Sequence, residues 1–230
     1  MNIIKLINED KYNLDQKLQG HSDTVYNIIE IRDNELISVS YDKTMKKWEL
    51  KNNQFECTKT ITFQNSNSNS WCNILKLNDN EFVTSSVSDK CIKFWNSNDY
   101  SNISTINNIE CDWTSRNMCK LDDDILCIGG NNSKGFYIIK ISTHQLIKNI
   151  VGPKSIYSIY ECFDGLFLCS TINENGNHAI AKYKYENENM NKIIEKENVH
   201  EKDIYTCIEF NNGKIVASGS ADNSIILWSD

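Results

Sequence analysis

Two sets of side chains in this sequence have the types found in a hydrolytic triad. The sets are His21, Ser38 and Asp42, and His200, Ser218 and Asp222. In such a triad the histidine accepts the serine proton, and the carboxylate orients the imidazole ring. In both sets a tryptophan follows six residues after the aspartate, at Trp48 and at Trp228. A pattern that returns at nearly the same spacing indicates a repeated structural unit, so we predict no catalytic residue in either set.

Nine cysteines form the second group that could carry chemistry, and they stand at positions 57, 72, 91, 111, 119, 127, 162, 169 and 207. No two form a Cys-x-x-Cys pair, and none has a neighbouring histidine at the spacing of a zinc site. Most lie within apolar runs such as residues 125–128, which favours small buried side chains in a reducing compartment. We therefore expect a cytoplasmic protein with no metal and no cofactor.

The net charge, the short apolar runs and the absence of known catalytic motifs argue against several classes of function. The formal net charge is −7, and the sequence contains no cluster of lysine or arginine. An acidic surface repels phosphate groups, so we expect no nucleic-acid partner. The apolar runs are far shorter than the ~20 residues of a membrane span, so we expect no membrane insertion. The sequence also has no phosphate-binding loop and no Gly-x-Ser-x-Gly motif, and we predict that the protein is not an enzyme.

An internal repeat organises the whole chain. Its five copies begin at residues 28, 74, 118, 159 and 207, so the steps are 46, 44, 41 and 48 residues. Each copy has an apolar strand, a tight turn of Asp, Asn or Gly, a second strand, another turn, and a third strand, and a more polar strand precedes the next copy. This spacing is typical of one four-stranded propeller blade. We divide the single domain, residues 1–230, into blades at about 11–50, 55–97, 100–141, 144–185 and 192–230.

The residues at fixed places in the copies resemble the WD-repeat family. The first copy carries the signature most fully, with Gly20, His21, Ser38, Asp42 and Trp48. The fifth has His200, Ser218, Asp222 and Trp228, and the second keeps Ser85 or Ser86, Asp89 and Trp95 without the histidine. The third and fourth copies are degenerate, with Ile138 at the tryptophan position of the third and Tyr183 near it in the fourth. The resemblance implies an all-β propeller of about five four-stranded antiparallel blades, in which the His, Ser, Asp and Trp side chains form a structural hydrogen-bonded chain.

Two ways of closing the ring remain open. In the first, residues 12–18 complete the last blade as its fourth strand, which would give a sealed ring and a monomer. In the second, the chain is a partial propeller, and residues 3–7 belong to a blade further upstream. An open ring would expose apolar sheet faces, which is a liability for aggregation. We favour the first arrangement on this ground.

The resemblance also implies where a partner would bind. In WD-repeat proteins the aligned position near the start of each first strand faces one surface of the propeller, and here it holds Tyr26, Cys72, Arg116, Tyr157 and Tyr205. Tyr41 stands before a turn aspartate, and Trp113 lies in the loop before a first strand. Tyrosine, tryptophan and arginine dominate protein-binding hot spots. The alternative is that these tyrosines merely suit strand edges and that Trp113 fills the core.

We therefore predict a non-catalytic scaffold that binds proteins or peptides on one face of the propeller. The alternative is a substrate-recognition or targeting module of a larger assembly, such as a ubiquitin-ligase receptor or a signalling enzyme. The sequence does not identify the partner in either case.

Overall fold

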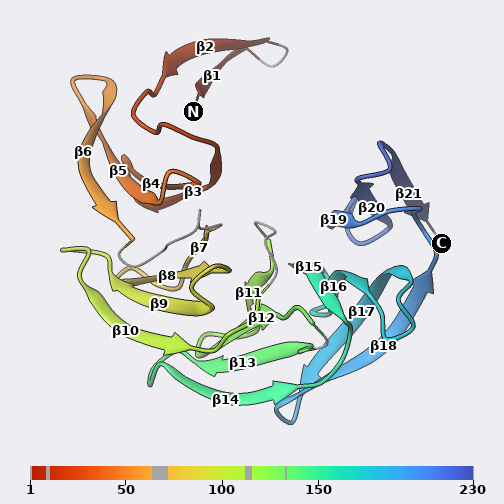
Figure 1. Ribbon diagram of the computed structural model, residues 1–230. Helices are drawn as coiled ribbons and strands as arrows, with labels where there is room; N and C mark the ends of the chain where they lie inside the picture. Colours follow the sequence, from red (N-terminus) through yellow and green to blue (C-terminus); the bar gives the residue numbers. More distant parts are fainter. Residues whose placement is uncertain (1, 9–10, 64–71, 112–115, 133, 230) are drawn as a thin grey trace.

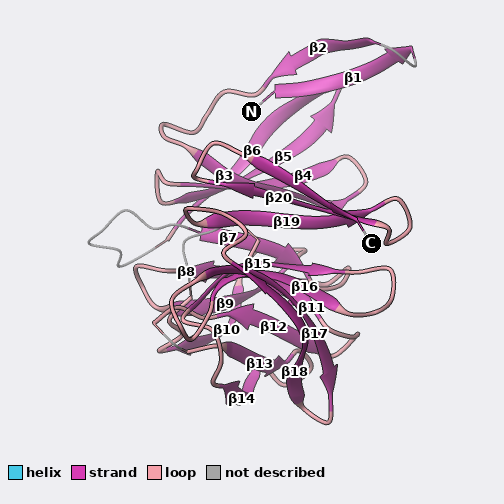
Figure 2. Cartoon of the chain, turned by 90° about the vertical axis from the view of Figure 1, so that its right-hand side faces the viewer, coloured by secondary structure: helices cyan, strands magenta, loops and turns pink. Residues whose placement is uncertain are grey.

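The computed structural model describes residues 2–8, 11–63, 72–111, 116–132 and 134–229, and for residues 2–8, 11–15 and 72 it describes the backbone alone. All regular elements of these residues are β-strands (Figure 2), which confirms the predicted fold class. Within the same ranges there is no helix of the length and apolarity that a membrane span requires.

Four of the five blades are complete four-stranded antiparallel sheets. Blade 1 contains β3 (Val25–Arg32), β4 (Glu35–Ser40), β5 (Thr44–Lys51) and β6 (Gln54–Thr62). Blade 2 contains β7 (Cys72–Lys76), β8 (Glu81–Ser86), β9 (Cys91–Asn96) and β10 (Asn102–Asn107). Blade 3 contains β11 (Met118–Lys120), β12 (Ile125–Gly129), β13 (Phe136–Lys140) and β14 (Gln145–Ile150). Blade 4 contains β15 (Ser155–Glu161), β16 (Phe167–Ile172), β17 (His178–Glu186) and β18 (Asn189–Glu197).

The fifth blade differs, because the described residues give it three strands. These are β19 (Ile204–Phe210), β20 (Ile215–Ser220) and β21 (Ile225–Ser229). Near the N-terminus, β1 (Asn2–Asn8) and β2 (Lys11–Lys17) pair with each other as a separate hairpin. The sheets coincide with the repeat copies but are offset by one strand from the blade ranges given above, because the polar strand at the start of each later range is the outer strand of the preceding sheet.

The blades follow one another in an open arc (Figure 1), with β3, β7, β11, β15 and β19 as the inner strands. The first ring closure that we considered is wrong, because β2 pairs with β1 and not with β21. The end of β2 is instead fixed to blade 1, where the Gln16 amide exchanges two hydrogen bonds of 2.8 Å with the backbone of Phe55. The described residues therefore form a five-bladed propeller in which the first and last blades share no strand.

Asparagine forms many of the tight turns within the blades. Asn34 has a φ of 63° in the β3–β4 turn, and Asn211 and Asn212 have φ values of 54° in the β19–β20 turn. Asparagine tolerates this left-handed region better than most side chains do, because its short polar group can bond to the nearby backbone. The Asp/Asn clusters of the repeat thus set the strand pairing within each blade.

An apolar cluster fills the space between each pair of neighbouring blades. Between blades 1 and 2, Ile37 and Met45 pack against Phe82 and Trp95, and none of these side chains is more than 6 % exposed. Blades 2, 3 and 4 thus each use two apolar faces, one toward the preceding blade and one toward the next. The stability of each blade therefore depends on its neighbours, as in other repeat architectures.

Polar side chains also connect the inner strands. The Asn27 amide donates to Asn73 Oδ1 at 2.6 Å, and the Asn73 amide donates to Asn117 Oδ1 at 3.2 Å. At the same place in blade 4, Ser158 Oγ lies 3.4 Å from the sulfur of Cys207 in blade 5. In blades 1 to 4 this row stands one residue after the predicted partner-binding position, and Cys207 stands two residues after Tyr205, so the row fixes the strand ends that carry these positions.

Candidate functional site

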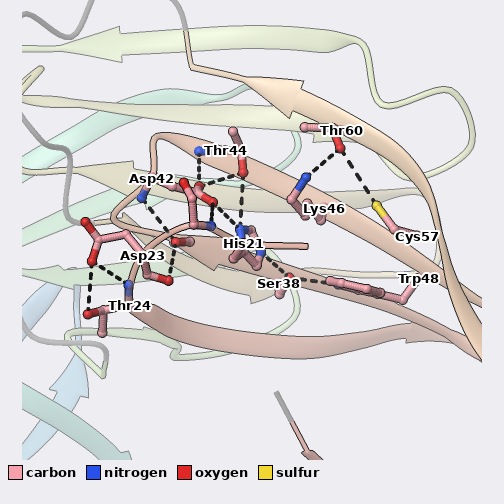
Figure 3. A network of polar contacts seen from close by, with 12 residues as sticks. His21, Asp23, Thr24, Ser38, Asp42, Thr44, Lys46, Trp48, Cys57 and Thr60 are labelled. Carbon is pink, nitrogen blue, oxygen red and sulfur yellow. Dashed lines mark hydrogen bonds and ion pairs between the residues drawn. The ribbon is translucent and has the colours of Figure 1, made fainter. Parts of the chain in front are cut away.

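The first triad-like set forms a continuous hydrogen-bonded chain in blade 1 (Figure 3). His21 Nδ1 lies 2.8 Å from Asp42 Oδ2, and His21 Nε2 lies 2.7 Å from Ser38 Oγ. The carboxylate can only accept, so Nδ1 carries the proton and Nε2 accepts from the serine hydroxyl. Ser38 Oγ in turn accepts a bond of 2.8 Å from Trp48 Nε1. The geometry matches a triad in distance and direction.

The burial of these hydrogen-bonded side chains, however, indicates a structural role. The Ser38 side chain has no exposed surface, and the indole N–H of Trp48 already bonds its oxygen. Burial lowers the pKa of His21, and the Asp42 carboxylate offsets only part of that effect. Burial raises the pKa of Asp42, but hydrogen bonds from Thr44, His21 and the Ser22 amide outweigh it and hold that pKa below its usual value. A serine that no substrate can reach is a structural hydrogen-bonding centre.

Blade 5 repeats this chain almost atom for atom. His200 lies 2.8 Å from both Asp222 and Ser218, and Trp228 Nε1 donates to Ser218 Oγ at 3.3 Å. The structural role that the resemblance implied for these side chains therefore applies to both sets.

Two predictions of signature residues, in blades 2 and 3, were wrong. In blade 2 the indole of Trp95 donates to Thr84 Oγ1 at 2.9 Å, and not to Ser85 or Ser86 as we expected. In blade 3 the tryptophan position is occupied by Ile139 and not by Ile138, because Ile139 faces blade 2 whereas Ile138 faces blade 4. A shift of one residue reverses the face of a strand, and spacing alone did not determine it. Tyr183 takes the equivalent place in blade 4 and pairs with Phe167.

Three of the predicted partner-binding residues lie at neighbouring inner strands. The rings of Tyr157 and Tyr205 meet edge to face with centroids 6.1 Å apart. Arg116 precedes β11 and bridges to Ser158 next to Tyr157, with a hydrogen bond of 2.9 Å from the Ile159 amide to its carbonyl. Tyr157 is only 5 % exposed, whereas Tyr205 is 39 % exposed and Arg116 is exposed as well. Tyr157 is therefore a buried support for the Tyr205 ring, while the side chains of Arg116 and Tyr205 are exposed to a partner.

A cavity of about 510 Å³ lies at this surface. Arg116 and Tyr205 line it together with apolar or small residues of blade 5, namely Ile208, Ala217, Gly219 and Ile225. Its volume is within the range of ligand pockets, and it combines a cation, an aromatic ring and apolar walls. We call this cavity and its lining residues the Arg116–Tyr205 surface.

The remaining predicted residues lie elsewhere. Tyr26 and Tyr41 form a separate edge-to-face pair on blade 1, with ring centroids 6.0 Å apart, and both are half-buried. Burial raises the pKa of Tyr26. Trp113 and the side chain of Cys72 lie outside the described residues. Among the described residues, the predicted contact residues therefore form two groups. One is Tyr26 with Tyr41, and the other is Arg116 with Tyr157 and Tyr205.

One feature of this region had no signal in the sequence. The face of blade 5 that points away from blade 4 is apolar but uncovered, with Ile225 77 % and Leu227 64 % exposed. The corresponding face of blade 1, with Val39 and Met45, is completely buried by blade 2. Ile225 and Leu227 share one face of β21, and whether a blade covers that face depends on residues that are distant in the sequence.

A group of metal-ligand types also occurs between blades 4 and 5. Cys162, Asp164 and Glu209 bring their ligand atoms within 4.8 Å of one another. The Lys182 ammonium lies between the two carboxylates, 2.6 Å from Glu209 and 3.3 Å from Asp164. Burial raises the pKa of Cys162 to about 12, so its thiol is protonated at neutral pH. The lysine supplies the positive charge here, and the group is an ion-pair network.

Comparisons with known proteins agree with this geometry. The family model described as WD domain, G-beta repeat matches residues 13–49 and 192–229, which contain the two complete His–Ser–Asp–Trp chains. No curated protein matches the chain.

Two solved structures illustrate the likeness of fold. The WD40 β-propeller domain of Doa1 is 21 % identical, with a TM-score of 0.69 over 95 % of this chain and 68 % of that one. A chain in the crystal structure of the mitotic checkpoint complex is 13 % identical, with a TM-score of 0.72 over 95 % of this chain and 65 % of that one. The protein thus spans about two thirds of the length of these two chains. Two of its repeats thus match the WD-repeat family model, and its blades have the fold of WD40 β-propellers.

Proposed function

We propose that this protein is a non-catalytic docking platform that binds a protein or peptide partner at the Arg116–Tyr205 surface. The cavity of about 510 Å³ carries the proposal, because an exposed arginine and an exposed tyrosine border apolar walls there. Arginine and tyrosine next to a desolvated pocket are typical of the residues that contribute most to binding energy. Tyr157 would hold the Tyr205 ring in place and so reduce the entropy lost on binding.

A role as the recognition module of a larger assembly is the second candidate. One observation favours it, namely the exposed apolar side chains of Ile225 and Leu227 on blade 5, which no described blade covers and which adjoin the Arg116–Tyr205 surface through Ile225. Apolar patches of this kind mark interaction sites on soluble proteins. A cytoplasmic location is part of the proposal, because six of the eight cysteines whose side chains are described are buried, and small buried thiols suit a reducing compartment.

The proposal is tested by quantitative affinity capture from native extract. The bait variant R116A/Y205A removes both exposed groups, and the control variant K134A/K148A removes two exposed lysines of blade 3. We expect the first variant to lose specifically captured proteins while it unfolds at the same denaturant concentration as the wild type. Equal capture by the wild type and R116A/Y205A would refute the Arg116–Tyr205 surface as the docking site.

A further inference from the structure

Two neighbouring interfaces between blades contain the same kind of contact. Tyr100 follows β9 of blade 2 and His144 follows β13 of blade 3, each five residues after the tryptophan position of its blade. Both residues have a left-handed backbone, with φ values of 65° and 52°. Tyr100 donates a hydrogen bond to Glu35, and His144 contacts Glu81. These two glutamates are the first residues of β4 and β8, so the same position reaches the same place in the preceding blade.

The contact between His144 and Glu81 is largely buried. Its two side chains are 15 % and 21 % exposed, and His144 Nε2 lies 3.2 Å from Glu81 Oε1. The imidazole ring also lies against the fully buried ring of Phe94, with centroids 4.3 Å apart and an angle of 32° between the ring planes. Although the carboxylate is near, Nε2 forms no hydrogen bond with a described residue. The attraction between the two groups therefore depends on a positive charge on the ring.

Glu35, in contrast, does not depend on its aromatic partner for a compensating charge. Lys47 Nζ lies 3.3 Å from its carboxylate, and Arg32 Nε lies 4.0 Å from it. Burial raises the pKa of Tyr100 well above its usual value, so the tyrosine hydroxyl stays protonated. Lysine, arginine and tyrosine do not ordinarily change their charge between about pH 5 and about pH 8. The contact between blades 1 and 2 is therefore insensitive to pH in that range.

Glu81 lacks both of these cations. Phe94 and Asn78 occupy the equivalent positions in blade 2, and neither side chain can carry a charge. Among the described residues, His144 is the one ion-pair partner of Glu81. The ring and the cation have thus exchanged places between the two interfaces, because here the ring lies on β9 and the titratable cation lies in the turn after β13.

The remaining charged side chains of the surrounding elements are paired with one another or point away. The pairs are Lys76 with Asp79, Lys120 with Asp123, and Lys140 with Asp124. Lys93 of β9 directly precedes Phe94, so its side chain points to the opposite face of the strand. In the part of the chain that is described, the charge of Glu81 is therefore balanced by His144 alone.

We propose that His144 is a pH-sensitive switch in the contact between blades 2 and 3. Protonation places a cation between the Glu81 carboxylate and the Phe94 ring, and both groups attract it. Loss of the proton leaves a largely buried carboxylate without a compensating charge, so the β13–β14 turn separates from blade 2 more readily. Histidine is the side chain that ordinarily changes its charge between about pH 5 and about pH 8. The switch lies apart from the Arg116–Tyr205 surface and is tested independently of it.

Hydrogen exchange of the whole chain measures how readily the β13–β14 hairpin opens. The readout is the protection of its amides in the wild type divided by that in H144Y, at about pH 6 and at about pH 8. This ratio cancels the intrinsic pH dependence of exchange and the contributions of the other histidines. H144Y is the matched variant, because tyrosine occupies the equivalent position at Tyr100. We expect the ratio to be about fivefold higher at about pH 6, as one partly buried ion pair allows.

The same comparison in an E81Q background tests whether Glu81 is the partner. Glutamine keeps the shape of the side chain but has no charge, so the ratio of E81Q to E81Q/H144Y should not change with pH. H144N provides a second neutral variant, since asparagine also tolerates the left-handed backbone of this position, and it should give the same pH dependence as H144Y. A wild-type ratio that is constant or falls toward acid would overturn the proposal, and so would an unchanged pH dependence in the E81Q background.

Discussion

Met45 and Ile225 occupy equivalent positions in the first and last blades, yet Met45 is fully buried and Ile225 is 77 % exposed. Each lies three residues after the turn aspartate of its blade and pairs with the middle strand, Met45 with Val39 and Ile225 with Gly219. The difference arises because blade 2 covers blade 1, whereas no described blade covers this face of blade 5.

This comparison predicts that a substitution by alanine destabilises the protein strongly at Met45 and very little at Ile225. M45A should lower the free energy of unfolding by about 2–5 kcal/mol, because it leaves a cavity in a packed cluster. I225A should change it by less than about 0.5 kcal/mol, as is usual at an exposed position. Guanidinium denaturation of both variants measures the difference. A comparable loss in I225A would mean that this face is covered in solution.

The buried polar chain of blade 1 predicts a second stability effect. Ser38 bonds both His21 and Trp48, so S38A leaves two buried polar groups without their partner. We expect a loss of about 1–3 kcal/mol. The control T58A alters an exposed position on β6 and should have almost no effect. An S38A variant as stable as T58A would show that the chain does not stabilise the blade.

The lowered pKa of His21 predicts a pH dependence. In the unfolded chain its pKa returns to about 6.5, so the unfolded state binds the proton more readily than the folded state does. The contribution of neutral His21 is therefore complete above that pH and is lost as the pH falls below it. The carboxylate of Asp42, whose folded pKa is lowered, loses its contribution only below about 3.8.

The variant H21Q separates this effect from the other histidines. We expect the difference in unfolding free energy between wild type and H21Q to shrink between about pH 7.5 and about pH 5.5. Urea denaturation at the two pH values provides the measurement. A difference that stays constant or grows toward acid would contradict the lowered pKa.

The asparagine row predicts coupling between blades. Asn73 is buried, and it accepts a hydrogen bond from Asn27 Nδ2 and donates one to Asn117 Oδ1 across the two blade boundaries. A double-mutant cycle of N27A and N73A should therefore give a coupling energy of about 0.5–3 kcal/mol. A second cycle combines N27A with N149A. It serves as the uncoupled control, because Asn149 lies on the outer strand of blade 3. If the destabilising effects of N27A and N73A simply add, the asparagine row does not couple the blades energetically.

The repeats were predictable because each depends on local pattern. Strand periodicity, the Asp/Asn turns and the spacing of Trp48, Trp95 and Trp228 all act within a single blade. The same local signals located the two buried polar chains correctly.

Relationships between distant residues could not be predicted in this way. Ring closure depends on how far each blade rotates from the last, and no short segment encodes that rotation. For the same reason the sequence did not show that β2 pairs with β1 or that Ile225 is uncovered. Among the site residues, the sequence brought Arg116, Tyr157 and Tyr205 into one group but could not distinguish the buried tyrosine from the exposed one.

The central claim is that a partner docks at the Arg116–Tyr205 surface, and photo-crosslinking from position 205 tests it most directly. A benzoyl-phenylalanine replaces Tyr205 in one sample and the exposed Ile147 of the outer strand β14 in a control sample, and both are irradiated in native extract. The account predicts discrete crosslinked species from position 205 that the additional change R116A removes, and none of them from position 147. The same species from both positions, or their persistence in R116A, would contradict it.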